Sequence, residues 1–315
     1  MHTLGRLLRL SLLPSAVADV TVRMLLGGAG VWPEGVAPGL LVLSSLGIYH
    51  GSMALNDWAD RAEDEETRPD RPIPSGAISP GLALLVAVLL ICGGLAAAWL
   101  SGAAVGLWMS AVAACAVTYD LRGRGPTLGP LLLGLCRFGN LGAGILAAQV
   151  WSGRDGVELA WFLPAVLYGA YVFLLSRLAR LEDQSDGALA RVDIRRVALV
   201  ALTPFLALPI SAAFLPTAPG MLSVAACAFL CGIALRGPLA YSLPRTSWGR
   251  PEIGKLTGML LRRLLMFTAA ACLLLLDAVE WGSVRVEGYT PILVALFVLG
   301  GYPLAHGLRR IYPPT

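Results

Sequence analysis

The chain is organised around residues 56–76, which read N-D-W-A-D-R-A-E-D-E-E-T-R-P-D-R-P-I-P-S-G. This stretch is the most acidic in the sequence, and it lies between two almost entirely apolar segments, residues 36–55 and 81–100. Each flanking segment has the roughly 20 apolar residues that a membrane-spanning helix needs. The arrangement therefore predicts a wall of carboxylates where two transmembrane helices meet the membrane surface.

The spacing of the acids favours a metal site. A helix that enters from residue 40 and continues through the stretch places Asn56, Asp60 and Asp64 on one face, with Asp57 beside them. Like charges this close together repel each other, so the pattern predicts that cations sit between them. Mg²⁺, which prefers oxygen ligands, is the natural candidate.

The composition excludes a soluble protein. Over 315 residues the chain is 57% hydrophobic and 14% charged, with a mean hydropathy of +0.71. These values are typical of a polytopic membrane protein. The net charge of +4 is modest and the basic residues are scattered, so no nucleic-acid partner is expected. The six cysteines fall inside apolar runs without metal-type spacing, which predicts small buried side chains.

The apolar runs predict nine or ten membrane spans. The first is the weakest because Asp19 and Arg23 interrupt it, four residues apart, where they could pair. The predicted spans cover about residues 11–30, 37–56, 81–100, 102–119, 127–150, 159–178, 196–215, 219–236, 258–279 and 289–308. The predicted fold class is therefore an all-α polytopic membrane protein.

The basic residues predict the orientation. With a cytoplasmic N-terminus and ten spans, most of the 24 lysines and arginines lie in or within a turn of the inner segments. Only Arg154 and Arg285 fall in the outer loops. An excess of basic residues on the cytoplasmic side is the usual pattern, so the acidic stretch is predicted to face the cytoplasm. In a bacterium the membrane would be the inner membrane.

A second acidic cluster follows the sixth predicted span. Glu182, Asp183 and Asp186 lie there, and Glu182 and Asp186 repeat the i, i+4 spacing of Asn56 and Asp60. The repetition predicts one transmembrane domain over residues 1–315 built from two four-helix halves, about 11–150 and 159–279, plus a C-terminal helix, about 289–308. The two clusters would then lie across one central cavity.

The first acidic motif resembles the first signature of the UbiA superfamily of intramembrane prenyltransferases. The similarity is carried by Asn56-Asp57-x-x-Asp60-x-x-x-Asp64 together with Arg68-Pro69-x-Arg71-Pro72. It implies a bundle of nine to ten helices in which Asn56, Asp57, Asp60 and Asp64 hold Mg²⁺ on a prenyl diphosphate and Arg68 and Arg71 contact the phosphates. A water-poor site with metal and arginine is well suited to neutralise a leaving diphosphate. A solvated acidic loop is the structural alternative.

The same resemblance assigns further residues. The superfamily's second signature is usually Asp-x-x-x-Asp, and here Glu182, Asp183 and Asp186 would supply its metal ligands, although Glu182 departs from the pattern and an ordinary charged loop is the alternative. Tyr119, with Arg122 or Arg124 in place of the family's lysine, would bind the diphosphate. The alternative interpretation is that these arginines only fix the orientation of the helix in the membrane.

Two polar residues inside the fifth predicted span complete the candidate site. A charge in lipid is costly, so Arg137 is expected to face the interior of the bundle, with Asn140 on the same face. Together they could bind the acceptor, or Arg137 could pair with a carboxylate such as Asp19 for structure alone. His50 is expected to line the pocket. A finer resemblance, to the EboC-type branch of UbiA-like proteins, rests on Leu13-Pro14-Ser15, Tyr119-Asp120 and Cys136-Arg137-Phe138-x-Asn140.

The function implied is Mg²⁺-dependent transfer of a prenyl group from an isoprenoid diphosphate to a small acceptor, aromatic or other. Catalysis would fall to Asp57, Asp60, Asp64 and Asp186. A transporter or a non-catalytic binder of lipid diphosphates is the alternative. Transporters tend to have broken spans at mid-membrane positions, whereas these acids gather at one surface, which favours the enzyme.

Overall fold

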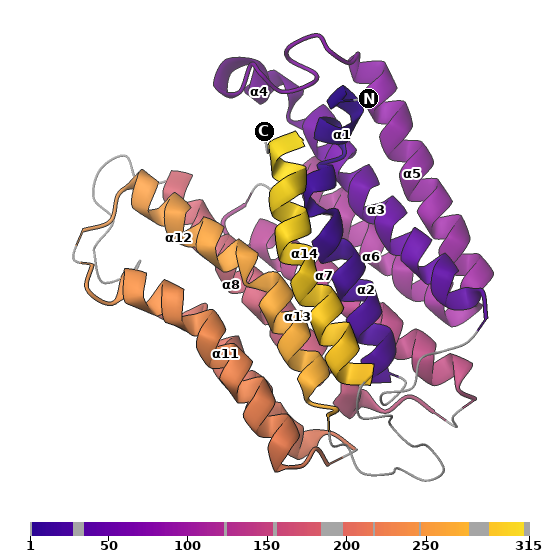
Figure 1. Cartoon of the computed structure of the whole chain (residues 1–315). Helices are drawn as coiled ribbons and strands as arrows, with labels where there is room; N and C mark the ends of the chain where they lie inside the picture. The colour runs from indigo at the N-terminus through magenta and orange to yellow at the C-terminus, as the bar shows by residue number, and fades with distance from the viewer. Residues whose placement is uncertain are drawn as a thin grey trace.

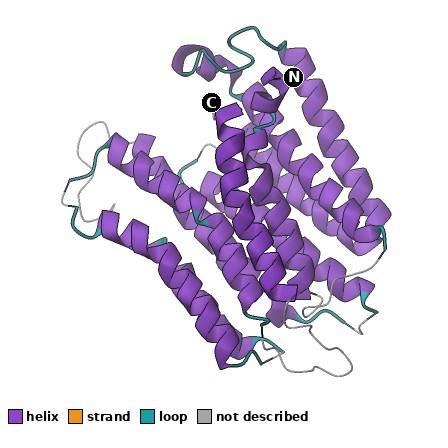
Figure 2. Ribbon diagram, viewed as in Figure 1, coloured by secondary structure: helices purple, strands orange, loops and turns teal. Residues whose placement is uncertain are grey.

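The structure is a computed structural model, and it describes residues 2–27, 35–122, 125–153, 156–183, 198–216, 218–245, 247–276 and 290–311. Within these ranges the regular structure is entirely helical and contains no strand (Figure 2). The predicted all-α fold class is confirmed.

Seven of the described helical segments are long and apolar enough to cross a membrane. They are α3 (Ala37–Ala59), α5 (Pro80–Ser101), α6 (Ala103–Arg122), α7 (Leu128–Trp151), η2 with α8 (Leu159–Phe162 and Leu163–Asp183), α11 (Met221–Ser242) and α12 with α13 (Arg250–Arg262 and Leu264–Leu273). Shorter apolar helices include α2 (Leu13–Gly27), α10 (Thr203–Ile210) followed by η3 (Ser211–Phe214), and α14 (Thr290–Ile311). Each of the predicted apolar segments corresponds to one of these elements.

Two boundaries differ from the sequence prediction. The segment predicted to begin at residue 258 begins at Arg250, because α12 carries polar side chains on one face and its first turns fall below the apolar threshold of a span. The first predicted span, about 11–30, is not one continuous α-helix, because η1 (Leu10–Leu12) forms its start and α2 continues from Leu13. It is preceded by α1 (His2–Leu7) and by Arg9, which has a left-handed backbone with φ of 49°.

Helices α3 and α5 approach each other closely because glycines line their contact. A Cβ atom placed on Gly94 would lie 2.9 Å from the carbonyl oxygen of Ser44, and one on Gly47 would lie 2.7 Å from the carbonyl oxygen of Leu90. Close backbone approach at small residues is the usual way in which helices associate in membranes. The contact fixes α3, and α3 carries the acidic motif at its end.

On the other side of the bundle an aromatic cluster joins three helices. The rings of Tyr171 on α8 and Phe267 on α13 stack with their centroids 6.1 Å apart, and Phe205 on α10 packs edge-on against both. The hydroxyl of Tyr171 donates a hydrogen bond of 2.7 Å to the carbonyl oxygen of Leu260. These contacts tie α8, α10, α12 and α13 together.

The acidic stretch lies at one end of the bundle. Figure 1 shows the short helix α4 (Arg61–Thr67) at the end where α1 and the last turn of α14 also lie. The N-terminal segment, the acidic motif and the end of the described chain therefore share one face of the molecule.

Candidate active site

The acidic motif begins in α3 and bends at Asp60. Asp60 separates α3 from α4, and its backbone ψ of 0° departs from helical geometry. Hydrogen bonds nevertheless continue across the bend: the amide of Asp60 donates to the carbonyl of Asn56, and that of Asp64 to the carbonyl of Asp60, each at 2.9 Å. Asn56 Nδ2 donates to Asp60 Oδ2 at 3.3 Å, so these two side chains are neighbours as the spacing predicted. The expected continuous helix is wrong at this residue.

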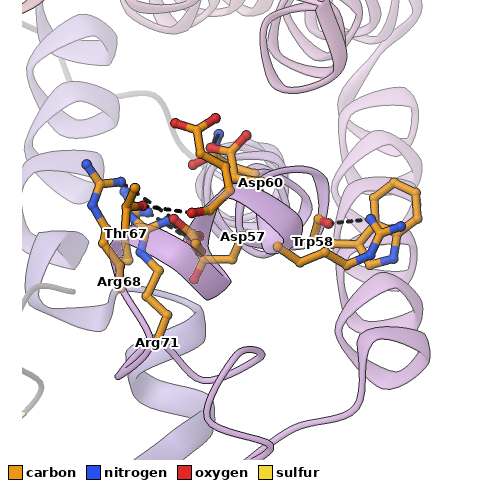
Figure 3. Close-up of polar contacts among 11 residues, drawn as sticks. Asp57, Trp58, Asp60, Thr67, Arg68 and Arg71 are labelled. Atoms are coloured by element: carbon orange, nitrogen blue, oxygen red, sulfur yellow. Dashed lines mark hydrogen bonds and ion pairs between the residues drawn. The ribbon is translucent and has the colours of Figure 1, made fainter. Parts of the chain in front are cut away.

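Asp57, before the bend, and Asp64, after it, are both held by arginine. Arg71 Nη1 donates to Asp64 Oδ2 at 2.6 Å and to Asp57 Oδ1 at 3.4 Å, and Arg9 Nη2 donates to the same Asp57 oxygen at 2.9 Å. Asp57, Asp64 and Arg71 are all buried. Figure 3 shows Arg71 and Asp57 pointing toward each other on one side of the helix, with Trp58 on the other side.

The loop after α4 is fastened to this network. Arg68, which is largely exposed, lies 3.7 Å from Asp64 Oδ1, and Arg6 donates to the carbonyl oxygen of Asp70 at 2.7 Å. Ile73 is buried among apolar side chains of α3 and α5. The two arginines predicted to clamp phosphate thus bind carboxylates of the motif in this structure, and their contact with phosphate stays a prediction.

A cavity of about 320 Å³ lies next to the motif, between α3, α6 and α7. Its polar walls include Asn56, Tyr119, Arg137 and Asn140, all of which the sequence predicted to lie in the site. The remaining lining residues are Arg9, Leu12, Ser45, Ile48, Tyr49, Ser52, Met53, Val112, Ala116, Asp120, Leu133, Cys136 and Leu261. Residues far apart in the sequence therefore meet around one largely apolar chamber.

Arg137 lies in this chamber and is paired. Its Nη1 donates to Asp19 Oδ2 at 2.5 Å, and its Nη2 donates to the hydroxyl of Tyr49 at 3.3 Å. The hydroxyl of Tyr168 donates to the other Asp19 oxygen at 2.8 Å. The pairing with Asp19 that the sequence offered as an alternative is confirmed. The guanidinium also lines the chamber, and its contact with an acceptor stays a prediction. It lies between this chamber and a second one of about 260 Å³.

Other predicted site residues lie elsewhere. His50 is buried, with Nδ1 2.7 Å from the carbonyl oxygen of Leu8. It is not among the lining residues of the two chambers, and its role in the pocket stays a prediction. Arg122 is exposed at the end of α6. Glu182 and Asp183 belong to the last turn of α8, but their side chains lie outside the described part of the chain, as do Arg124 and Asp186 entirely. The placement of the second acidic cluster across the cavity from the first therefore stays a prediction.

The described residues contain no preformed group of three His, Cys, Asp or Glu side chains arranged around a metal ion. Arginines explain this in part, because Arg9 and Arg71 bind the carboxylates that would otherwise turn to a cation. The donor set nonetheless fits Mg²⁺: it consists of carboxylate and amide oxygens. Oδ2 of Asp57 is buried, and it has no hydrogen-bond partner among the described residues.

Three residues of the site were missed or left unassigned by the sequence. Arg9 is one of the basic residues that predicted the membrane orientation, and the sequence assigned it no other role. Tyr168 gave no signal beyond its place in an apolar run. Asp120 was noted beside Tyr119 without a role. An acid in the last turns of an apolar helix was the available signal for Asp120. The pairing of Tyr168 with Asp19 joins positions 149 residues apart, and spacing alone does not reveal it.

Comparison with known proteins agrees with this geometry. The model of the UbiA prenyltransferase family matches residues 12–248. This chain belongs to that family. The predicted membership is confirmed, and the UbiA match covers both the acidic motif and the helices that line the chamber.

Curated UbiA relatives are similar over short stretches. The chain is 49% identical over 57 residues to a digeranylgeranylglyceryl phosphate synthase of Methanothrix thermoacetophila, covering 18% of this chain and 21% of that protein. It is 40% identical over 76 residues to the bacteriochlorophyll synthase 33 kDa chain of Cereibacter sphaeroides, covering 23% and 25%. The chain thus matches about a quarter of the length of these relatives or less.

Solved UbiA structures share the fold over most of the chain. A UbiA homolog from Aeropyrum pernix K1 aligns with a TM-score of 0.59 at 18% identity, over 81% of this chain and 96% of that one. A UbiA homolog from Archaeoglobus fulgidus bound to Cd²⁺ aligns with a TM-score of 0.52 at 15% identity, over 96% and 99%. At these identities the likeness establishes the fold alone.

Proposed function

We propose that this UbiA family member is a membrane-embedded prenyltransferase, which moves a prenyl group from an isoprenoid diphosphate to a small acceptor with the help of Mg²⁺. The observation that carries the proposal is the meeting of the acidic end of α3 with the chamber lined by Asn56, Tyr119, Arg137 and Asn140. An acidic mouth and an apolar interior suit a substrate with a diphosphate head and a hydrocarbon tail.

The carboxylates at the mouth would hold the metal. Asn56, Asp57 and Asp60 supply oxygen donors beside the cavity, and Asp64 would join them if Arg71 moved toward phosphate. When bound, Mg²⁺ neutralises the charge that develops on the leaving diphosphate. Arg71 and Arg68 are placed to add charge-assisted hydrogen bonds to phosphate oxygens, which are a better match for a guanidinium fork than a single carboxylate oxygen.

The walls of the chamber would protect the reacting carbon. Breaking the allylic carbon–oxygen bond leaves a carbocation that water would capture, so the apolar side chains of Ile48, Met53, Val112 and Leu133 serve by excluding water. The acceptor forms a bond to this carbon instead of water. The acceptor then loses its proton to a nearby base or to solvent.

Arg137 and Asn140 are the proposed contacts of the acceptor. Asp19 already balances the charge of Arg137, so the guanidinium offers hydrogen-bond donors more than an unbalanced positive charge. Asn140 Oδ1 accepts a hydrogen bond of 2.8 Å from Ser45, which fixes the direction of its amide. A polar acceptor group within the chamber would meet both side chains.

The experiment is turnover of labelled prenyl diphosphates by purified protein with Mg²⁺ and candidate acceptors. We expect Mg²⁺-dependent release of diphosphate and a covalent prenyl product. Asp60→Ala should abolish turnover while leaving membrane insertion intact, and Asp70→Asn, an exposed acid of the same stretch, should keep it. Full activity of Asp60→Ala would contradict the assigned role. Movement of the substrate across proteoliposomes without a covalent product would favour a transporter instead.

A further inference from the structure

Asp120 is a buried carboxylate that the proposed mechanism does not yet use. It lies on α6, near the end of that helix, and its side chain is 3% exposed. Its Oδ2 atom has no hydrogen-bond partner among the described residues. Burying a carboxylate oxygen without a partner is costly, so a fold that keeps one needs something to balance it.

The charges around Asp120 are mostly of its own sign. It lies close enough to interact electrostatically with Asp60 and Asp57, both from the acidic motif, and with one cation, Arg9. Arg9 is already bonded to Asp57 Oδ1 at 2.9 Å. Asp57 also keeps a buried, unpartnered Oδ2. Carboxylates from two helices are therefore gathered here, and two of them, Asp57 and Asp120, each keep one buried oxygen without a hydrogen-bond partner among the described residues.

The cavity places these groups together. Asp120 lines the same chamber as Asn56 and Arg9, directly beside Tyr119. Its helix packs against α3, and Asp120 lies within electrostatic reach of Asp57 and Asp60 at the end of α3. Asp120 thus brings a buried, unpartnered carboxylate oxygen to the wall of the cavity, and carboxylate oxygens are the ligands that a hard divalent cation prefers.

We propose that Asp120 is a further ligand of the divalent cation, so that the bound metal bridges α3 and α6 rather than resting on the acidic motif alone. The inference rests on the proposed function, because it concerns the metal of that site. The cation would also fix the distance between the two helices and thus the width of the chamber mouth.

The test measures Mn²⁺ binding by the detergent-purified full chain. The concentration of free Mn²⁺ is monitored by its electron paramagnetic resonance signal. Asp120→Asn should raise the Kd for Mn²⁺ by about tenfold or more, since even residues that only orient a metal ligand change affinity by roughly 10–100-fold. Asp120→Glu, which keeps the carboxylate, should recover part of the affinity. Asp70→Asn, the matched exposed control, should bind as the wild type does.

Thermal unfolding supplies a second readout that does not depend on activity. Without metal, Asp120→Asn should unfold at a higher temperature than the wild type because it removes carboxylate repulsion. Saturating Mn²⁺ should raise the unfolding temperature of the wild type more than that of Asp120→Asn. The reason is that an ion stabilises a protein to the extent that it binds the native state.

The outcomes separate this inference from the proposed function. If Asp120→Asn binds Mn²⁺ like the wild type while Asp60→Asn does not, Asp120 is not a ligand and the proposed function stands. If the wild type binds no Mn²⁺ even with a prenyl diphosphate present, both proposals are overturned. An Asp120→Asn protein that is less stable than the wild type without metal would also overturn the inference, because the residue would then be held by structural contacts.

Discussion

Arg71 is the residue on which the acidic motif depends for its shape. Its guanidinium is buried between Asp57 and Asp64, and both carboxylates are buried as well. Removing one partner of a buried ion pair leaves the other charge uncompensated, at a cost of about 3–5 kcal/mol. We therefore expect Arg71→Ala to lower the free energy of unfolding by that amount, measured by thermal or chemical unfolding in detergent.

Arg68 provides the matched control three residues away. Its side chain is 57% exposed, and it lies 3.7 Å from Asp64. Exposed pairs of this kind contribute about 0–1 kcal/mol, so Arg68→Ala should unfold almost as the wild type does. Equal losses in the two variants would show that the buried network does not hold the motif.

At the residue scale, the sequence predicted which side chains lie near one another in the acidic motif better than it predicted their long-range partners. The i, i+4 spacing of Asn56 and Asp60 led correctly to adjacent side chains. The partners of Asp57 come from Arg9 and Arg71, which lie 48 and 14 residues away, and no local pattern specifies them. Long-range ion pairs depend on how helices pack, and that is decided by the whole bundle.

At the scale of elements, the contact between α3 and α5 is sensitive to a single methyl group. A Cβ on Gly94 would lie 2.9 Å from the carbonyl oxygen of Ser44 and 3.0 Å from the amide nitrogen of Ile48, so the backbones would have to separate. Overpacking of this kind costs about 1–3 kcal/mol. We expect Gly94→Ala to lower the unfolding temperature and also to weaken turnover, because α3 carries Asn56 and Asp57.

Gly93 provides the matched control for the Gly94→Ala variant. It precedes Gly94 on the same helix, and a Cβ there meets nothing within 4 Å. Gly93→Ala should therefore be neutral or slightly stabilising, given the higher helix propensity of alanine. If both variants unfold at the same temperature as the wild type, the close approach of α3 and α5 does not constrain the site.

Helix α2 is held by a polar contact inside the bundle. Asp19 is 1% exposed and accepts hydrogen bonds from Arg137 on α7 and Tyr168 on α8. Asp19→Asn should destabilise the fold by about 3–5 kcal/mol, since it leaves the buried charge of Arg137 without a counter-ion. The double variant Asp19→Asn with Arg137→Gln should recover part of this loss in unfolding measurements. Equal or greater instability of the double variant would argue against the pair.

The elements themselves followed from the sequence because apolar length is a strong signal for spans. Their ends did not follow as well. The bend at Asp60 was missed because its backbone hydrogen bonds and side-chain spacing both continue across it, and the start of α12 was missed because the early turns of that helix are amphipathic. Helix ends are set by contacts outside the helix, which hydropathy does not record.

On the scale of the whole molecule, one end of the bundle gathers the groups proposed for chemistry. The acidic motif, the N-terminal segment that carries Arg9 and the last turn of α14 lie together there (Figure 1). Elsewhere, large apolar side chains such as Leu89 on α5 and Phe229 on α11 are mostly exposed, as expected for surfaces that face lipid. The molecule is thus polar at the site end and apolar along its sides.

This asymmetry leads to a prediction about orientation. Basic residues cluster in the segments predicted to be inside, so the end with the acidic motif should face the cytoplasm.

Two exposed serines on opposite sides of the predicted membrane allow a test. Ser75 lies in the loop after α4, and Ser152 lies just beyond α7. In intact cells, a membrane-impermeant maleimide should label Ser152→Cys, and it should label Ser75→Cys only after permeabilisation. The unmodified chain, whose cysteines lie within helices, is the control for background labelling. The reverse pattern would place the proposed site on the outer face, where cytoplasmic prenyl diphosphates would not reach it.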